Sequence, residues 1–533
     1  MDKNAIKKYA VWARNELIAR VTQKAAQYEI TEKKTTPKDS DSIGGRLLTE
    51  AEKKQRKALI EKIEADGFEQ VMEEVAYTWF NRFTALRFME VNNYLPSHTR
   101  VFTNESGEFK PQILADAIQL NLEGLNMDKV FELKDANKTE ELYKYLLITQ
   151  CNSMSAILPR MFQKIEHYTE LLLPDYLLRE GSVIEQMIAL VPEKDWMDQV
   201  QIIGWLYQYY NSEPKDKVFG KKGKFDKEEI PAATQLFTPD WIVRYMVENS
   251  LGNYWLDHHN DSEIQNHWNY YISNIARNHI EDMNPSCIRF IDPCAGSGHV
   301  LCYAFDVFVQ IYEKYGYSIK EAVQSIIENN IYGLDIDERA AQLSYFSVMM
   351  KARQYDRRFF NKKDVDGELS IPQPHIFLVR ESNGITVTQL QELGKNMSAD
   401  ERELAEQQAS ELIKEFRDAK EYGSMVSVKK KDWNLLRRFA SIASLQGQQQ
   451  LDFYGIIDAS ERICDLIDIG EVLAQKYDVI STNPPYMKAD NMPAKLAEYV
   501  LNYNEFAKYD LYSAFIYKCY EMLKKGSSRI FVG

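Results

Sequence analysis

Residues 287–305 contain the pattern that most restricts how this chain can fold. An apolar strand over Ile288–Asp292 ends in a carboxylate, a turn with Gly296 and Gly298 follows, and an apolar helix comes next. In α/β folds such a turn lies at the carboxyl end of a strand, where glycines let the backbone approach a ligand and the helix N-terminus faces it. The pattern therefore predicts an α/β fold with a nucleotide-type site at this turn.

Four further apolar stretches are expected to form strands of the same sheet: 330–337, 374–383, 477–482 and 528–533. Between the third and fourth strands, residues from about 386 to 470 are charged and have helical spacing, which predicts a helical insertion. The chain stops within the fifth strand, where a sheet does not normally end. We therefore expect this sequence to be part of a longer protein, truncated before a further region.

A chain of 533 residues is too long for one hydrophobic core, which predicts at least two domains. Residues 1–210 carry apolar side chains at three- and four-residue steps, most strongly over Phe68–Glu90, so a helical N-terminal domain is expected. Residues 211–230 interleave glycine and lysine with two phenylalanines, which predicts a basic flexible segment, either a solvated linker or a lid. Residues 231–533 are then expected to form the α/β core.

Composition argues against several classes of protein. No apolar run approaches the length of a membrane span and the charged start does not resemble a signal peptide, so a cytoplasmic protein without a membrane partner is expected. The six cysteines include no CxxC pair, so neither a metal site nor a disulfide framework is expected. The formal net charge of −14 argues against coating of nucleic acid through bulk charge, and any nucleic-acid surface must be local.

The fourth strand leads directly into Asn483-Pro484-Pro485-Tyr486. Proline has no backbone N–H and holds φ near about −65°, so this turn is rigid and its carbonyls are not drawn into a helix. It presents the amide oxygen of Asn483, the main-chain carbonyl of Pro484 and the ring of Tyr486. Two acceptors beside an aromatic face suit a flat substrate with an exocyclic NH₂ group. The motif predicts methyl transfer onto an amine, although a Pro-Pro turn that only ends a strand would look the same.

The amide oxygen of Asn483 and the carbonyl oxygen of Pro484 explain how an amino group that is a poor nucleophile could react. The lone pair of adenine N6 is delocalised into the ring, and acceptors that draw both amino hydrogens out of plane favour the pyramidal nitrogen of the transition state. No general base is needed before the attack, because the proton becomes acidic only after the methyl group has arrived. The donor should carry a positive sulfonium, which the ring of Tyr486 can help to hold.

Polar residues at the other strand ends are candidates for binding the donor. Leu301 stands where a dinucleotide fingerprint has its third glycine, which favours a smaller adenosyl ligand. We expect Asp292 to accept from the donor's amine and Asp335 to accept from both ribose hydroxyls, with Asp337 capping the next helix. Glu381 follows the third strand and is expected near the donor's adenine.

Thr238 and Pro239 are predicted to start a helix, as its N-cap and its first helical residue. A helix N-terminus gathers unpaired N–H groups and suits a carboxylate, such as that of a bound amino acid. Any capped helix has the same pattern, so this signal alone does not define a site.

The order of four motifs, FTP at 237–239, DPCAGSG at 292–298, GLDID at 333–337 and NPPY at 483–486, resembles the gamma arrangement of N6-adenine DNA methyltransferases. That group includes type I modification subunits and fused restriction-modification enzymes. The segments WFNRFTALRFMEVNNYLP and VQIIGWLYQYYNSEPKDKVF look closer still to the PglX family, the adenine methyltransferases of BREX phage-defence systems. The resemblance covers essentially the whole chain. It implies a Rossmann-like S-adenosylmethionine-dependent methyltransferase domain preceded by an all-helical N-terminal domain.

The same resemblance divides the candidate residues into two groups. The catalytic group is Asn483, Pro484, Pro485 and Tyr486. The group expected to line the donor, S-adenosyl-L-methionine, is Phe237, Thr238, Asp292, Cys294, Ala295, Gly296, Gly298, Asp335 and Ile336, with Glu381 added from its place after the third strand.

The resemblance implies methylation of adenine N6 in DNA, which would mark host DNA in a BREX-type phage-defence system. Double-stranded DNA is then the substrate, with the target adenine flipped out of the helix, and other phage-defence proteins are candidate partners. Two alternatives stay open. NPPY also occurs in enzymes that methylate a glutamine amide in proteins, and the chain could instead be a non-catalytic component that binds the donor within a defence complex.

Overall fold

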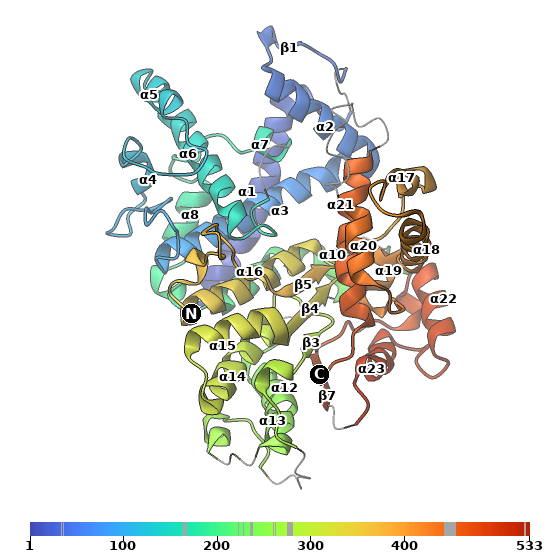
Figure 1. Ribbon diagram of the computed structural model, residues 1–533. Helices are drawn as coiled ribbons and strands as arrows, with labels where there is room; N and C mark the ends of the chain where they lie inside the picture. Colours follow the sequence, from blue (N-terminus) through green and yellow to red (C-terminus); the bar gives the residue numbers. More distant parts are fainter. Residues whose placement is uncertain are drawn as a thin grey trace. The chain divides into compact units, whose positions relative to one another are not determined.

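The computed structural model describes residues 1–533 except positions 34, 36, 164–167, 222, 227, 228, 235–237, 260, 262, 274–280, 442–454, 527 and 528. The chain divides into two compact units (Figure 1). The first consists of Met1–Glu213 with Arg357–Ile371, and the second of Pro214–Asp356 with Pro372–Gly533. None of the helices in the described part of the chain is both long and apolar enough to span a membrane.

Helices make up most of the regular structure of the first unit. They are α1 Lys3–Gln27, α2 Glu50–Asp66, α3 Phe68–Val91, α4 Gln112–Ala115, α5 Met127–Asp135, α6 Thr139–Ser153, α7 Tyr168–Leu171, α8 Val183–Leu190 and α9 Gln201–Tyr210. From Tyr77 onward α3 is buried on almost every side, which explains why its aromatic residues do not follow a single stripe. Helix α1 packs against both α3 and α9, so these three helices form the centre of the unit.

A small hairpin in this unit was not expected from the sequence. Strands β1 Ser42–Ile43 and β2 Arg46–Leu47 pair antiparallel. The two residues between them, Gly44 and Gly45, have φ values of +54° and +81°. Positive φ at both central positions is the geometry of the tight hairpin turn that glycine favours. The first unit is therefore mainly helical and not entirely so.

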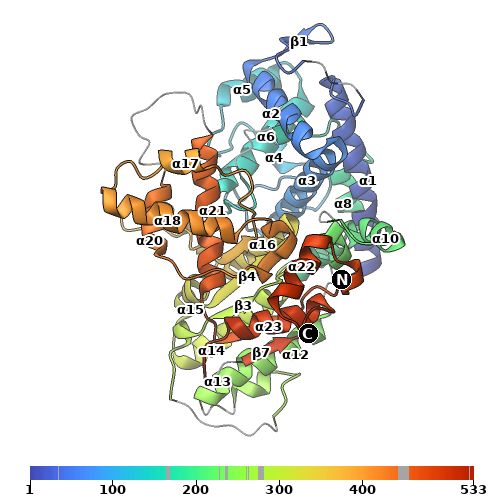
Figure 2. The ribbon, with the colours of Figure 1, turned by 90° about the vertical axis from the view of Figure 1, so that its right-hand side faces the viewer.

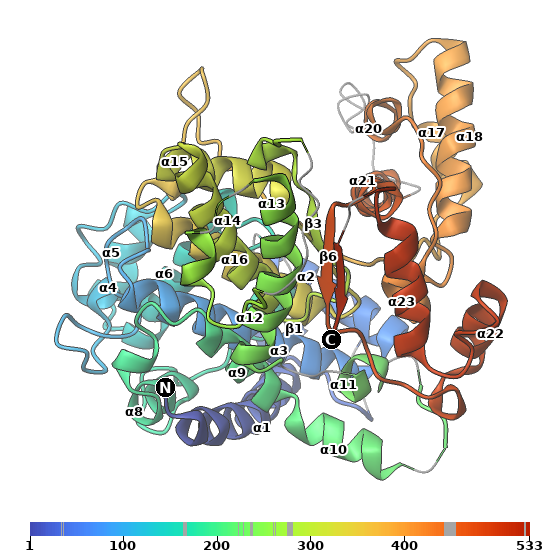
Figure 3. The same ribbon diagram turned by 90° about the horizontal axis from the view of Figure 1, so that it is seen from below.

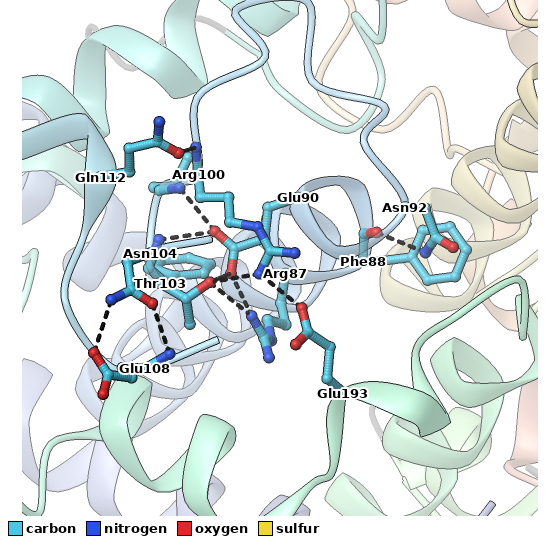
Figure 4. A network of polar contacts seen from close by, with 12 residues as sticks. Arg87, Phe88, Glu90, Asn92, Arg100, Thr103, Asn104, Glu108, Gln112 and Glu193 are labelled. Atoms are coloured by element: carbon cyan, nitrogen blue, oxygen red, sulfur yellow. Dashed lines mark hydrogen bonds and ion pairs between the residues drawn. The ribbon is translucent and has the colours of Figure 1, made fainter. Parts of the chain in front are cut away.

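A buried polar network fastens the loop after α3 to that helix (Figure 4). Glu90 Oε2 accepts from the backbone N–H groups of Val101 and Phe102 at 2.7 and 2.8 Å. Its Oε1 accepts from Arg87 Nη1 at 2.5 Å and from the Thr103 hydroxyl at 3.2 Å. A buried carboxylate is tolerated when a cation and several N–H groups surround it, so this network has a structural role.

The second unit is built on a five-stranded sheet. Its strands are β3 Phe290–Asp292, β4 Ile331–Asp335, β5 His375–Leu378, β6 Val479–Thr482 and β7 Arg529–Val532. Their order is β5-β4-β3-β6-β7, and every neighbouring pair is parallel. All five lie within the stretches expected to be strands. The predicted α/β sheet is therefore confirmed.

Helices cover both faces of this sheet. The helices from residue 212 onward are α10 Ser212–Gly220, α11 Ile230–Thr234, α12 Asp240–Val247, α13 Asn253–His258, α14 His299–Tyr315, α15 Ile319–Ser325, α16 Glu338–Tyr355, α17 Val387–Glu392, α18 Ala399–Glu415, α19 Ala419–Tyr422, α20 Trp433–Ala440, α21 Ile456–Ala474, α22 Ala494–Tyr503 and α23 Leu511–Met522. Figure 3 shows α14 and α16 on one side of the sheet and α21 and α23 on the other. This layered arrangement buries both faces, as parallel sheets require.

The described part of the chain between β5 and β6 carries the helices α17 to α21. Figure 2 shows α17, α18 and α20 grouped around α21. Apolar side chains of these helices share one core with Leu334 of β4 and Ile480 of β6. The inserted region therefore covers a face of the sheet, because its longest helix takes the place of an ordinary crossover helix.

The segment 211–230, expected to be a flexible basic loop, contains the helix α10 in its first half. Pro214 lies in the first turn of α10, where a missing N–H costs nothing. Further along, Phe225 is buried and its N–H donates to the Asn491 carbonyl at 3.0 Å. Lys221 forms ion pairs with Asp226 and Glu229, so part of the basic charge is neutralised within the segment.

Candidate active site

The carboxyl edge of the sheet brings three expected site residues together. Asp292 ends β3, Asp335 ends β4, and Asn483 directly follows β6. Because β3 lies between β4 and β6, these residues follow adjacent parallel strands and emerge at the same edge. The connection that leaves β3 leads to β4 on one side, and the connection that leaves β6 leads to β7 on the other; ligands of α/β proteins bind at such a switch point.

The two glycines of the turn after β3 have different roles. Both adopt positive φ, +54° at Gly296 and +81° at Gly298. A Cβ on Gly298 would lie 2.8 Å from the Cα of Ser344, so this glycine lets the turn pack against α16. A Cβ on Gly296 would meet no atom within 4 Å. Open space therefore lies beside Gly296, where a ligand can approach the backbone.

Asp292 and Asp335 are carboxylates without a cationic partner. Asp292 is buried and accepts from the Thr482 hydroxyl at 2.6 Å and from the Cys294 N–H at 3.0 Å. Asp335 accepts from the N–H groups of Gly296 and Asp337, each at 2.8 Å. Within the described chain, no Lys, Arg or His lies within ion-pair distance of either carboxylate.

This environment raises the pKa of both carboxyl groups to about 7. Burial is the main cause in each case, since desolvation penalises the charged form. The charge of Asp335 raises the pKa of Asp292 further, and the charge of Asp337 does the same for Asp335. Strongly shifted carboxyl groups at a strand edge mark a candidate ligand site, because a donor-rich ligand would restore the ionised form.

Asn483 is held by a residue far away in the sequence. Its Nδ2 donates to Thr238 Oγ1 at 3.0 Å, which leaves the amide oxygen Oδ1 pointing the other way. Thr238 is buried, and its carbonyl lies 3.0 Å from His299 Nδ1. The amide orientation is thus set by the chain that precedes α12.

The predicted helix start at Thr238 is wrong by one residue. Helix α12 begins at Asp240, with Pro239 at the cap position and no side-chain cap hydrogen bond. Thr238 does not cap the helix because its hydroxyl oxygen accepts from Asn483 instead. Asp337, by contrast, caps α16 as expected, since its carboxylate accepts from the Arg339 N–H at 3.0 Å.

The prolines of the motif leave one acceptor open. Pro484 is buried, yet no described donor pairs with its carbonyl oxygen. The Tyr486 hydroxyl lies 2.8 Å from Asn483 Oδ1 and 2.6 Å from the Gly533 carbonyl. One hydroxyl proton serves only one of these acceptors at a time. When it bonds to Gly533, Asn483 Oδ1 is open to another donor.

The ring of Tyr486 has one covered side. It stacks on Tyr512 with ring centroids 5.4 Å apart and an interplanar angle of 12°. The residue is 48% exposed, so part of its surface remains accessible. Tyr512 was not among the sequence candidates. It stacks on Tyr486 because of where α23 packs, and no local sequence pattern marks that position.

The remaining expected donor residues are distributed around the turn. The Ala295 N–H donates to the Leu334 carbonyl at 2.9 Å, and Cys294 is partly buried. Ile336 lies close to the backbone of Gly423. Glu381 follows β5 and makes no hydrogen bond or ion pair with any described residue, so the structure does not join it to the others. Phe237 lies outside the described residues.

Thr482 is a residue of this site that the sequence did not reveal. Its hydroxyl donates to Asp292 across 190 positions of sequence. The only sequence signal was its place as the last residue of a strand before Asn483. The contact depends on β6 lying beside β3, which a strand pattern does not specify.

Comparisons with known proteins found one family model and several similar proteins. Residues 329–532 match the family model of the Eco57I restriction-modification methylase. A putative type II restriction enzyme and methyltransferase of Methanocaldococcus jannaschii is 30% identical over 20% of this chain and 11% of its own. The solved structure of a DrdV–DNA complex aligns with 98% of this chain and 35% of its own, at 12% identity and a TM-score of 0.39.

Two relatives are similar over 98% of this chain. The adenine-specific methyltransferase PglX of Lacticaseibacillus casei strain Zhang is 36% identical, and the adenine-specific methyltransferase BrxX of Escherichia coli O9:H4 strain HS is 35% identical. The chain spans about half of the length of these relatives, 46% in each case. The resemblance to PglX-type adenine methyltransferases is confirmed by these similarities.

Proposed function

We propose that this chain carries the catalytic site of an S-adenosylmethionine-dependent methyltransferase that acts on N6 of adenine in DNA. The observation that carries the proposal is the hydrogen bond from Asn483 Nδ2 to Thr238, which turns the amide oxygen away from Thr238, while no described donor pairs with the carbonyl of the next residue, Pro484. Two oriented acceptors at the carboxyl edge of the sheet are what an exocyclic amino group needs.

The residues around the turn fit the methyl donor. The space beside Gly296 accommodates an adenosyl group close to the backbone. In this proposal Asp335 accepts from the ribose hydroxyls and Asp292 from the amine of the donor. Both contacts favour the ionised carboxylates, which offsets the burial that raises their pKa. When bound, the donor supplies an electrophilic methyl group on a sulfonium.

The residues of the NPPY motif act on the acceptor. Asn483 and the Pro484 carbonyl each accept one amino hydrogen of adenine, which draws the nitrogen lone pair out of the ring and toward the donor. Pro485 keeps the turn rigid, and the exposed part of Tyr486 stacks against the base. The transition state, with its pyramidal nitrogen, is held more tightly than the planar substrate.

The wider role is proposed from the relatives. PglX and BrxX are adenine-specific methyltransferases, and this chain is similar to them over almost its whole length. We infer that the protein methylates host DNA within a phage-defence system, that the target adenine is flipped from the duplex, and that other defence proteins are its partners. The net charge of −14 means that DNA meets a local surface of the protein.

The test compares donor binding with methyl transfer in the full-length protein together with its natural partners. We expect Asn483→Ala to reduce transfer of a tritiated methyl group to unmethylated host DNA by roughly 100-fold or more, while the calorimetric affinity for S-adenosyl-L-methionine changes little. Asn434→Ala, an exposed position on α20, is the matched control and should leave both unchanged. Full transfer activity in the Asn483 variant would contradict the proposal.

A further inference from the structure

The strap, defined as Gly423–Val426, is a short segment of the inserted helical region that reaches the candidate active site. It follows α19 and begins with Gly423, whose φ is +56°. A Cβ at Gly423 would lie 3.5 Å from Ile336, so the strap passes directly over the residue after Asp335. The inserted region therefore contacts the turn region as well as the face of the sheet.

On one side the strap holds the turn after β3. The buried Ser424 donates its hydroxyl proton to the Pro293 carbonyl at 2.5 Å. Pro293 is the second residue of DPCAGSG and immediately precedes Cys294, whose N–H bonds to Asp292. The hydrogen bond thus fixes the start of the turn that leads to Gly296.

On the other side two helices hold the strap. The Tyr499 hydroxyl, on α22, donates to the Met425 carbonyl at 3.0 Å. The Lys518 ammonium, on α23, donates to the Val426 carbonyl at 2.7 Å. Lys518 is 3% exposed, and burial lowers its pKa to about 8. A lysine held in such a place, with no carboxylate in ion-pair distance among the described residues, gives a strong and directed hydrogen bond to the strap.

The apolar side of the strap completes the connection. Met425 is fully buried in a core that also contains Met487, the residue directly after Tyr486, and Leu511 at the start of α23. Cys294 of the turn packs against the same core. One contiguous cluster of side chains therefore extends from the turn after β3, through the strap, to the chain that follows the NPPY motif.

We propose that the strap positions the donor turn, with Ser424 anchoring it to Pro293 and with Tyr499 and Lys518 anchoring it to the helices that follow the NPPY motif. This inference rests on the proposed function, since it takes the turn to be the methyl-donor site. Ser424, Tyr499 and Lys518 are positioning residues that act through the backbone and touch neither donor nor target base. The inserted region thereby links the donor side of the site to its base side.

The first test is the variant Ser424→Ala in the full-length protein. Loss of one buried hydrogen bond predicts a roughly 5-fold weaker affinity for S-adenosyl-L-methionine by calorimetry. Hydrogen exchange of the backbone amides in residues 294–298 should become faster by a similar factor, because the turn opens more readily. The transfer rate at saturating donor should stay within about 2-fold, since no group that contacts the reacting atoms has changed. Ser424→Thr keeps the hydroxyl and should restore both readouts.

A matched control comes from the same inserted region. Ser460 is also buried, and its hydroxyl donates to the Ala440 carbonyl. Ser460→Ala therefore removes an equivalent hydrogen bond that does not reach the turn, and it should leave turn exchange and donor affinity unchanged. Equal effects of Ser424→Ala and Ser460→Ala would overturn the proposal, as would unchanged turn exchange in the Ser424 variant.

The second anchor is tested with Tyr499→Phe, which removes only a hydroxyl and keeps the ring in its stack with Tyr422. Like Ser424→Ala, it should speed hydrogen exchange of the backbone amides in residues 294–298, and unchanged exchange there would contradict the link across the strap. The exchange measurement needs no donor. Absence of donor binding in the unaltered protein would therefore refute the proposed function, while turn exchange would still decide whether the strap positions the turn.

Discussion

Two carboxylate sites, one in each unit, differ in what balances their charge. In the first unit Glu90 is surrounded by the Arg87 guanidinium, two backbone N–H groups and a hydroxyl (Figure 4). In the second unit Asp292 and Asp335 accept only from a hydroxyl and from backbone N–H groups. Burial raises the pKa of these two groups to about 7.

The difference separates a carboxylate with a complete set of partners from two carboxylates with an incomplete set, which are the donor-binding acids of the proposed function. A buried ion with a complete set of partners is costly to disturb and contributes nothing to chemistry. A buried ion with an incomplete set destabilises its own charged form and gains when a ligand supplies the missing donors. Side-chain type alone does not distinguish the two cases, because all three residues are ordinary acids in the sequence.

The largest expected effect is on the stability of the first unit. Glu90→Gln removes the charge that balances Arg87 and should lower the free energy of unfolding by about 3–5 kcal/mol, measured by denaturant titration. The control is Glu193→Gln, which breaks the more exposed ion pair with Arg100 and should cost less than about 1 kcal/mol. Equal losses for the two variants would remove the distinction between Glu90 and an ordinary surface acid.

The second prediction concerns Asp335, where we expect a large change in donor binding and little change in stability. Asp335→Asn should weaken S-adenosyl-L-methionine binding by roughly 10- to 100-fold in calorimetry, because the ribose hydroxyls lose a charged acceptor. At pH 8 the same change should leave stability unchanged or raise it, since the ionised Asp335 is unfavourable in the folded protein. Asp337→Asn keeps a cap on α16 and should retain donor affinity. A variant that binds the donor normally but unfolds more easily would make Asp335 a structural acid like Glu90.

The third prediction concerns the pH dependence of stability in the absence of donor. Asp292 and Asp335 have folded pKa values raised to about 7, above the value of about 3.9 for an unfolded chain. Their contribution to stability is therefore full below about pH 4 and is lost as pH rises through about 7. Thermal unfolding should show a loss of stability as pH rises over this range, and saturating donor should reduce that loss. Asp292→Asn should remove the part of the pH-dependent loss of stability that comes from Asp292. The same pH profile in this variant and in the unaltered protein would contradict a raised pKa for Asp292.

The sequence predicted the sheet well because its strands are short, mainly apolar runs, and β3, β4 and β6 each end in a polar residue. β3, β4, β5, β6 and β7 all lie where such runs were found. The NPPY residues were also identified, because proline and asparagine carry their backbone and hydrogen-bonding properties wherever they lie. The hairpin at 42–47 was missed, although its glycine pair is a recognised turn signal.

The contacts that orient the site could not be predicted in the same way. Thr238 was expected to cap a helix, and it accepts instead from Asn483, which lies 245 positions later in the chain. Thr482 and Ser424 had no candidate role, yet they bond to Asp292 and Pro293. Each contact depends on the order of the strands or on the path of the inserted region, which local spacing does not encode.

The amino-acid sequence by itself determined which groups are present and what each can do: a rigid turn with two acceptors, a glycine turn, and acids at strand ends. These are local properties of a few neighbouring residues. Only the tertiary structure decided which acids have no cation nearby in the described part of the chain, which way the Asn483 amide points, and what holds the turn after β3. Those outcomes depend on burial and on partners distant in the chain, and burial is a property of the packed molecule.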